Sequence, residues 1–240
     1  LKDVRLIIDD RKNGKLNDFV ANSLKVKIDD ETTYTAFTAR ENILVHNFLG
    51  DESSGSFLKE KNIEGGFSFR YVKNLKQLQF DNISINLSGH PFKVSGTFDL
   101  SGQDPQFSLT LHTRQVVYSL AKSFLPQKTE NALSVISIDS KIDADATISG
   151  PLRKGNAKIG VTWKVSNANL TTPFLNFTNA FFTGYYTNHA IPGQQSGDAN
   201  SKVVFTNFSA NWHGMPVTSG SIEIQNLLKP LLTCDLSSNF

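Results

Sequence analysis

The chain has 240 residues, enough for one large β domain or two ordinary ones, and it can bury a sizeable core. Its 24 basic and 22 acidic residues leave a net charge of +2, which gives no argument for binding nucleic acid. The single cysteine, Cys234, excludes an internal disulfide and any metal site built from several cysteines. Its position beside Leu232 and Leu236 predicts a small buried side chain.

Residues 1–65 predict an N-terminal β segment. Val4, Leu6 and Ile8 alternate with other residues at the period of a strand. A helical and a strand period compete over residues 16–28, and the β-branched residues favour a strand from about residue 20. Clusters of Gly, Ser, Asn and Asp separate the other strands expected in this part of the chain, at 32–39, 42–48, 55–60 and 66–72.

Two stretches of the chain, residues 80–111 and 205–236, are copies of one unit. With one residue dropped and one regained, ten of 32 aligned positions are identical, where about two are expected from ordinary residue usage. The identical pairs include Phe80 and Phe205, Asn82 and Asn207, and Gly89 and Gly214. A recurring unit of this kind is typical of repeat architectures, in which each unit buries its apolar face against its neighbours.

Each copy predicts an antiparallel meander of three strands with one apolar face. In the first copy Ile83, Ile85 and Leu87 alternate with polar residues, and a Gly-His-Pro sequence at 89–91 supplies the first turn. Residues 66–126 therefore form the first meander followed by a helix. That short helix is expected near 114–126, because an apolar stripe falls at helical spacing between Thr113, a candidate N-cap, and Pro126.

Residues 127–240 predict a second β portion that contains the second meander (204–237). Residues 135–149 read as one two-faced strand, and 173–186 as a pair of aromatic-rich strands. The polar, glycine-rich residues 190–201 form a loop before the second copy begins. No alternation of helices with strands is found, which disfavours a Rossmann or TIM-barrel fold, and the predicted fold class is all-β, mainly antiparallel.

Candidate catalytic groups are sparse. Asp139, Asp143 and Asp145 share one face of the predicted strand, and this pattern is typical of a solvated outer face more often than of a cation site. The five histidines lack the spacing of a zinc site, and no nucleophile elbow, P-loop or dinucleotide fingerprint occurs. We therefore expect neither an enzyme nor a cofactor or metal site.

The apolar stripes outnumber what one helix can cover, so the sheet must pack on another sheet, close on itself or hold something apolar. Periodicity alone favours a β-sandwich or barrel whose faces cover one another. No segment reaches the ~20 apolar residues of a membrane helix. The start LKDVRLIIDD lacks both a signal peptide and an initiator Met, and we expect a piece of a longer protein.

The order of strands and turns in this part of the chain resembles the AsmA family. The resemblance rests on INLSGHPFKVSGTFDL and DPQFSLTLH, followed by a short helix ending in Pro126 and then by SIDSKIDADATISGPL. The tail, PFLNFTNAFFTGYYTN followed by VVFTNFSANWHGMPVTSGSIEIQNLLKPLL, resembles it too. AsmA-like proteins are similar to bridge-like lipid-transfer repeat proteins. The resemblance implies a continuous, strongly curved, taco-like or half-barrel sheet with an apolar groove. It also implies a non-enzymatic protein that lies in the periplasm and is tethered to the inner membrane by an anchor outside this chain.

The partners implied by this resemblance are a phospholipid or another acyl lipid and further envelope proteins, in lipid transport between the membranes or in outer-membrane assembly. The residues expected to line the groove are Ile83, Ile85, Leu87, Phe98, Leu109, Ile138, Ile142, Val161, Trp163, Phe208, Trp212, Ile222 and Ile224. The alternative is a β-sandwich module that recognises glycan or protein. It requires exposed aromatic side chains, for instance Tyr185, Tyr186 or Trp212, on a flat platform.

Overall fold

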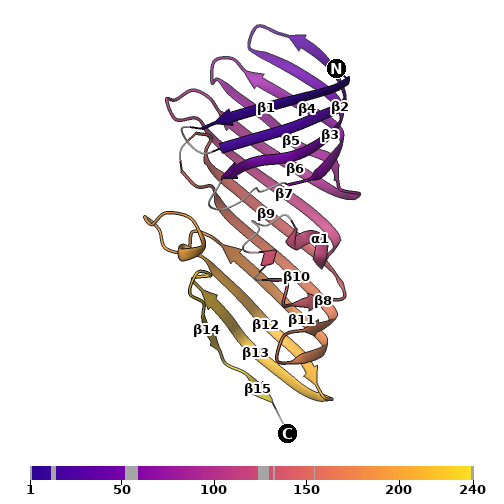
Figure 1. Cartoon of the computed structure of the whole chain (residues 1–240), viewed down its shortest axis with the longest axis vertical. Coiled ribbons are helices and arrows are strands. Elements are labelled where there is room, and N and C mark those ends of the chain that lie inside the picture. The colour runs from indigo at the N-terminus through magenta and orange to yellow at the C-terminus, as the bar shows by residue number, and fades with distance from the viewer. Residues whose placement is uncertain are drawn as a thin grey trace. The chain divides into compact units, whose positions relative to one another are not determined.

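The computed structural model describes residues 2–11, 15–51, 59–123, 130–131, 133–153 and 155–238 (Figure 1). Their secondary structure is almost entirely β, and the predicted all-β antiparallel fold class is confirmed. The strands are β1 (Lys2–Asp10), β2 (Lys15–Asp30), β3 (Tyr34–Asp51), β4 (Lys61–Val72), β5 (Gln77–Leu87), β6 (His90–Asp99), β7 (Gln106–Val117), β8 (Ser137–Ile138), β9 (Lys141–Pro151), β10 (Lys158–Thr171), β11 (Asn176–Thr187), β12 (Lys202–Trp212), β13 (Met215–Gln225), β14 (Leu231–Cys234) and β15 (Ser237–Ser238). The helices are α1 (Tyr118–Lys122) and the 3₁₀ helix η1 (Asp198–Asn200).

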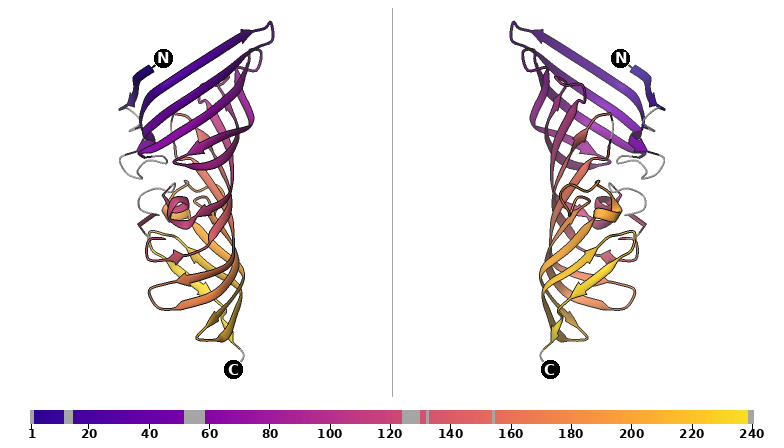
Figure 2. Two further views of the ribbon diagram at one scale, coloured as in Figure 1. Left: turned by 90° about the vertical axis from the view of Figure 1, so that its right-hand side faces the viewer. Right: turned by 90° about the vertical axis from the view of Figure 1, so that its left-hand side faces the viewer.

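The chain divides into two compact units. Unit 1 holds Leu1–His112, Ser123–Lys128 and Ser149–Gly155, and unit 2 holds Thr113–Lys122, Thr129–Ile148 and Asn156–Phe240. This division differs from the three segments expected from the sequence, since residue 65 lies inside β4. Each unit contains an open, curved antiparallel sheet in which, apart from the short strands β8 and β15, strands that follow one another in the chain are neighbours (Figure 2).

The strand order is β1-β2-β3-β4-β5-β6-β7-β9-β10-β11-β12-β13-β14, with β8 paired to β10 and β15 paired to β13 off this path. Such an order follows from short turns, because a hairpin connection places consecutive strands side by side. It has one hydrogen-bonded path through the described strands. A β-sandwich would divide the strands between two packed sheets.

The N-terminal strands are longer than the sequence pattern suggested. β2 begins at Lys15, so the residues that also fitted a helix are extended. The strands expected at 32–39 and 42–48 form one strand, β3, because Arg40 and Glu41 continue the ladder to β4 where a turn was expected. Most of the strand expected at 55–60 lies outside the described residues.

The internal repeat is confirmed for the first two strands of each copy. The β5–β6 and β12–β13 hairpins carry the same backbone irregularities, each 125 residues apart: the first positive φ is 53° at Asn82 and 54° at Asn207. At the turns, Ser88 and Gly89 have φ of 51° and 86°, and the corresponding residues His213 and Gly214 have 49° and 82°. Two consecutive positive φ angles make the type I′ turn that suits the twist of a hairpin.

The helix after the first copy is shorter than predicted. Thr113 through Val117 belong to β7, and α1 contains only Tyr118–Lys122. Arg114 and Gln115 bind Asp145 and Asp143 of β9, and these contacts hold the segment extended. The predicted helix end at Pro126 lies outside the described residues.

Two further expectations for the second portion were wrong. Residues 135–149 do not form one strand, because Asp139 and Ser140 separate β8 from β9, and Asp139 accepts hydrogen bonds from the backbone and side chain of Asn169. Residues 173–186 do not form a pair of strands either. A turn at 172–175, closed by hydrogen bonds between Thr172 and Leu175, leads into the single strand β11.

Candidate functional site: the apolar face of the sheet

In unit 1, the middle of the sheet carries a packed apolar cluster. Its buried members lie on β5 and β6, directly across from one another, with Ile83 opposite Val94 and Ile85 opposite Phe92. Phe98 and Leu109 continue the same face, since Phe98 pairs with Phe107 and Leu109 pairs with Gly96. Five of the predicted groove residues therefore share one face of unit 1: Ile83, Ile85, Leu87, Phe98 and Leu109.

The same face continues to β1 and β2, where it is open to solvent. Cross-strand pairing places Leu6 opposite Phe19, and Phe19 opposite the buried Val45 of β3. Val4, Leu6, Ile8, Val26 and Ile28 are between 39% and 59% exposed on this face, and we call them the exposed strip. A run of this kind costs free energy in water, which makes it a candidate contact surface.

In unit 2, the corresponding face is aromatic and closely packed. The ring centroids of Phe177 and Phe208 are 5.4 Å apart, those of Phe182 and Phe205 are 5.5 Å apart, and those of Trp163 and Phe205 are 5.9 Å apart. The Trp163 indole lies over Gly184 of the neighbouring strand, where a Cβ would sit 1.9 Å from its Cε2. Tilted and edge-to-face contacts of this kind add to the burial of the rings.

Part of this face in unit 2 is covered by the chain itself. Tyr118, Leu120 and Ala121 around α1, together with Ile136, pack on the buried cluster of the sheet. The Tyr118 hydroxyl donates a hydrogen bond to the carbonyl oxygen of Leu133 at 3.1 Å. Burial raises the pKa of Tyr118 to about 12, so the hydroxyl keeps its proton and remains a donor.

The remaining predicted groove residues all lie in unit 2, and they differ in environment. Ile138, Ile142 and Phe208 are buried members of its core cluster, and Trp163, Trp212 and Ile222 pack against that cluster. Val161 and Ile224 are half-buried and pair across the strands with Tyr186 and Val203. Cys234 was expected to be buried, and this was wrong. It pairs with Ile222 across the β13–β14 ladder, but its side chain is exposed.

Sequence reasoning missed Glu41, a carboxyl group on the apolar face of unit 1. Along β3 it lies between Ala39 and Ile43, with Leu24 opposite on β2 and Gly65 opposite on β4. Burial raises the pKa of Glu41 to about 7. The signal was present in the sequence, since Phe37, Ala39, Glu41, Ile43 and Val45 share one parity of a strand, but the two shorter predicted strands hid it.

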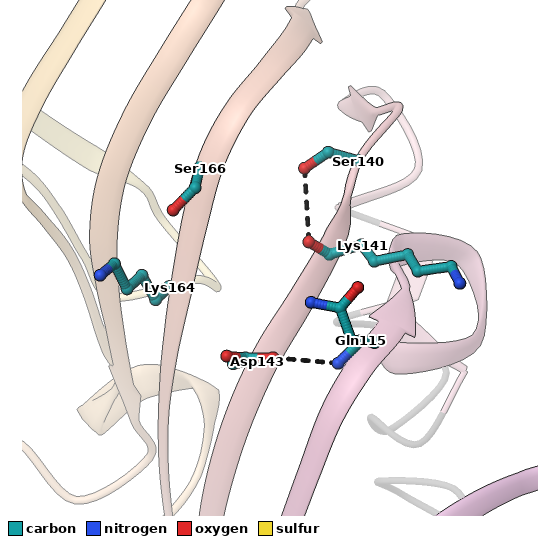
Figure 3. A pocket seen from close by; sticks show the side chains of 6 residues that line it. All are labelled: Gln115, Ser140, Lys141, Asp143, Lys164 and Ser166. Atoms are coloured by element: carbon teal, nitrogen blue, oxygen red, sulfur yellow. Dashed lines mark hydrogen bonds between the residues drawn. The ribbon is translucent and has the colours of Figure 1, made fainter.

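The aspartates that suggested a cation site bind protein groups. The Asp143 carboxylate accepts the backbone N–H of Gln115 at 2.9 Å, and Asp145 pairs with Arg114 at 2.9 Å. Among the residues that the structure describes, no three His, Cys, Asp or Glu side chains are grouped to hold a metal ion. Asp143 also lines an open polar hollow of about 320 Å³ with Gln115, Ser140, Lys141, Lys164 and Ser166 (Figure 3).

The aromatic platform needed by the alternative function does not form from the three residues named for it. Tyr185 is exposed, whereas its neighbour Tyr186 is buried on the other face of β11. Trp212 is half-buried and packs against the core cluster of unit 2. Successive residues of a strand point to opposite faces, so Tyr185 and Tyr186 cannot contribute to one flat surface.

The described part of the chain contains no helix long and apolar enough to cross a membrane. No protein-family model matches the sequence, and comparison with curated proteins and with solved structures also found no match.

Proposed function

We propose that this chain is a non-enzymatic, AsmA-like section of a periplasmic envelope protein that binds the acyl chains of a phospholipid or similar lipid on its apolar face. The observation that carries the proposal is the exposed strip of unit 1. Its side chains lie on the same face as the packed cluster of β5 and β6, so the apolar surface passes from buried to solvent-exposed without a change of face.

An acyl chain suits this surface because it needs no hydrogen bonds from the protein. The backbone groups of β2, β3 and β4 are already engaged in the ladders between these strands, so a ligand lying on the face meets side chains only. Water exposure of a 16-carbon chain costs on the order of 12 kcal/mol, at about 0.8 kcal/mol per methylene. Even partial cover by the exposed strip recovers a useful fraction of that free energy.

Adjacent residues of β1 provide a matched test. Leu6 and Ile7 are 54% and 53% exposed, but they point to opposite faces, Leu6 toward Phe19 and Ile7 toward Asp18. Purified protein would be extracted and its lipids quantified by mass spectrometry. We expect near-stoichiometric acyl lipid with the unchanged chain, a clear loss with Leu6→Gln and no loss with Ile7→Gln.

Three results would contradict the proposal. If the purified protein carries no lipid and binds no added phospholipid, an acyl lipid is not its ligand. Equal effects of Leu6→Gln and Ile7→Gln show that the apolar face is not the binding surface. A concentration-dependent dimer that Leu6→Gln dissociates shows that a second copy of the chain covers the strip.

A further inference from the structure

Glu41 places one ionisable group in the middle of an apolar surface. Its two neighbours on the same face of β3, Ala39 and Ile43, are apolar, and Ala39 is only 3% exposed. The residues directly across are Leu24 and Gly65. Because Gly65 has no side chain, β4 offers no side-chain group opposite Glu41 that could shield or bind its carboxyl group.

No compensating cation lies beside Glu41 among the residues that the structure describes. On its face of β2, the residues from Ala21 to Ile28 are apolar, and the facing residues of β5 are isoleucine and leucine. On β4 the titratable groups of this face are Lys61, opposite Val45, and Tyr71, opposite Thr35, so each stands at least two cross-strand pairs beyond Gly65. The Lys61 ammonium donates to the Ser123 hydroxyl at 3.0 Å.

The free energy of covering this site depends on the protonation state of Glu41. Hydrocarbon laid over an ionised carboxylate removes its remaining water and offers no hydrogen bond in return, which is strongly unfavourable. The same contact with a neutral carboxyl group is much less unfavourable, and its O–H can still donate to an ester carbonyl of a lipid. The pKa of about 7 means that both forms of the free protein are populated near neutral pH.

We propose that an acyl chain binds over this part of unit 1 preferentially when Glu41 is protonated, so that lipid binding takes up a proton wherever Glu41 is ionised in the free protein, and lipid release returns it. This inference deepens the proposed function and rests on it, because it assumes that the apolar face holds an acyl lipid. The sign follows from linkage: a ligand that prefers the protonated form binds more weakly as the pH rises.

The test requires a lipid that does not itself titrate over the range used. A phosphatidylcholine with one fluorescent acyl chain meets this condition, and its Kd would be measured at about pH 5.5, 7 and 8.5. Above the pKa, affinity should fall by about tenfold per pH unit until the ionised form begins to bind. We expect the Kd of the unchanged protein to rise at least tenfold over the range, and that of Glu41→Gln to change less than about twofold.

Glu64 supplies the matched control. It lies one pair from Gly65 on β4 but on the opposite face, where the side-chain amides of Asn42 and Asn62 both donate to its Oε1 at 2.8 Å. Glu64→Gln should keep the pH dependence of the unchanged protein. Equal pH dependence in the unchanged protein and Glu41→Gln overturns the inference and leaves the proposed function standing. Failure of every variant to bind the probe at any of these pH values overturns both.

Discussion

The apolar faces of the two units differ in what covers them. In unit 2 the residues around α1 pack on a cluster of aromatic side chains and cover part of the face, while Leu232 at the β14 edge of the same face is 61% exposed. In unit 1 the face is packed at β5 and β6 but solvent-exposed at β1 and β2. The same strand alternation produces both faces, so the pattern specifies which way a side chain points and not whether it is covered. The uncovered part is where we place ligand binding.

The largest expected contrast comes from truncating one apolar side chain in each unit. Phe208 of unit 2 is 4% exposed, whereas Ile28 of unit 1 is 59% exposed. Phe208→Ala leaves a cavity among Phe177, Phe182 and neighbouring rings and should lower the free energy of unfolding by about 3–5 kcal/mol. Ile28→Ala should cost well under 1 kcal/mol, because little burial is lost.

Chemical denaturation of both variants measures this difference. Ile28→Ala should reduce lipid binding although it leaves stability almost unchanged. A loss of stability for Ile28→Ala as large as that for Phe208→Ala would show that the strip is covered in the free protein, and the proposed difference between the units would be wrong.

Glycines beneath aromatic rings provide the second comparison, because both units use them. A Cβ at Gly184 would meet the Trp163 ring at 1.9 Å, and one at Gly96 would meet Leu109 Cδ2 at 2.6 Å, the Ser108 carbonyl oxygen at 2.7 Å and Phe80 Cζ at 2.9 Å. Both alanine variants should lose about 1–3 kcal/mol of stability, because Gly184→Ala displaces the Trp163 ring and Gly96→Ala crowds the Leu109 side chain and the backbone of β7. Gly66→Ala is the control, since its Cβ would meet only the Ala39 carbonyl oxygen at 3.8 Å. Thermal denaturation gives the order, and equal midpoints for Gly184→Ala and Gly66→Ala would contradict it.

Much of the fold could be predicted from local sequence pattern. The strand alternation around Ile83 and the repeated Asn82/Asn207 and Gly89/Gly214 positions correspond to real hairpins with matching φ angles. Alternation could not show that Arg114 and Gln115 would be held in β7 by Asp145 and Asp143, because these hydrogen bonds join residues about 30 apart in the chain. Helical spacing of apolar residues was therefore overruled by tertiary contacts.

The candidate site was predicted in part. Strand parity correctly gathered Ile83, Ile85 and Leu87 on one face, since side-chain direction is a local property. Exposure depends on which segments cover the face, and this is why Cys234 was wrongly expected to be buried. Glu41 was missed because its significance appears only when β2 and β4 are placed beside β3.

Glu41 also distinguishes unit 1 by the pH dependence of its stability, measured without lipid. Its pKa in the folded protein is about 7 against an ordinary value of 4.5, so between these values the folded state binds more protons than the unfolded state. Stability should therefore fall as the pH rises from about 4.5 to about 7, and stay lower above that range. Glu41→Gln should remove this loss, on the order of 1 kcal/mol once the remaining contact with water is allowed for. Urea midpoints at about pH 5 and pH 8 measure it, and a Glu64→Gln curve that flattens equally would refute the assignment.

The last comparison concerns a pair of equivalent asparagines, one in the repeated hairpin of each unit. Asn82 and Asn207 occupy equivalent positions with φ of 53° and 54°, where asparagine tolerates the left-handed region and glycine is free of Cβ strain. Asn→Gly at either position should change stability by a few tenths of a kcal/mol, whereas Asn→Val should cost about 1–2 kcal/mol, because a β-branched side chain is strained at this φ.

If the two hairpins are true copies, the two valine variants should shift the denaturation midpoint alike. Asn82 has one further contact, since its backbone N–H donates to the Ser95 hydroxyl at 2.9 Å, but the glycine and valine variants both keep this donor. A valine variant as stable as its glycine counterpart would show that the left-handed backbone at this position is not fixed by the fold.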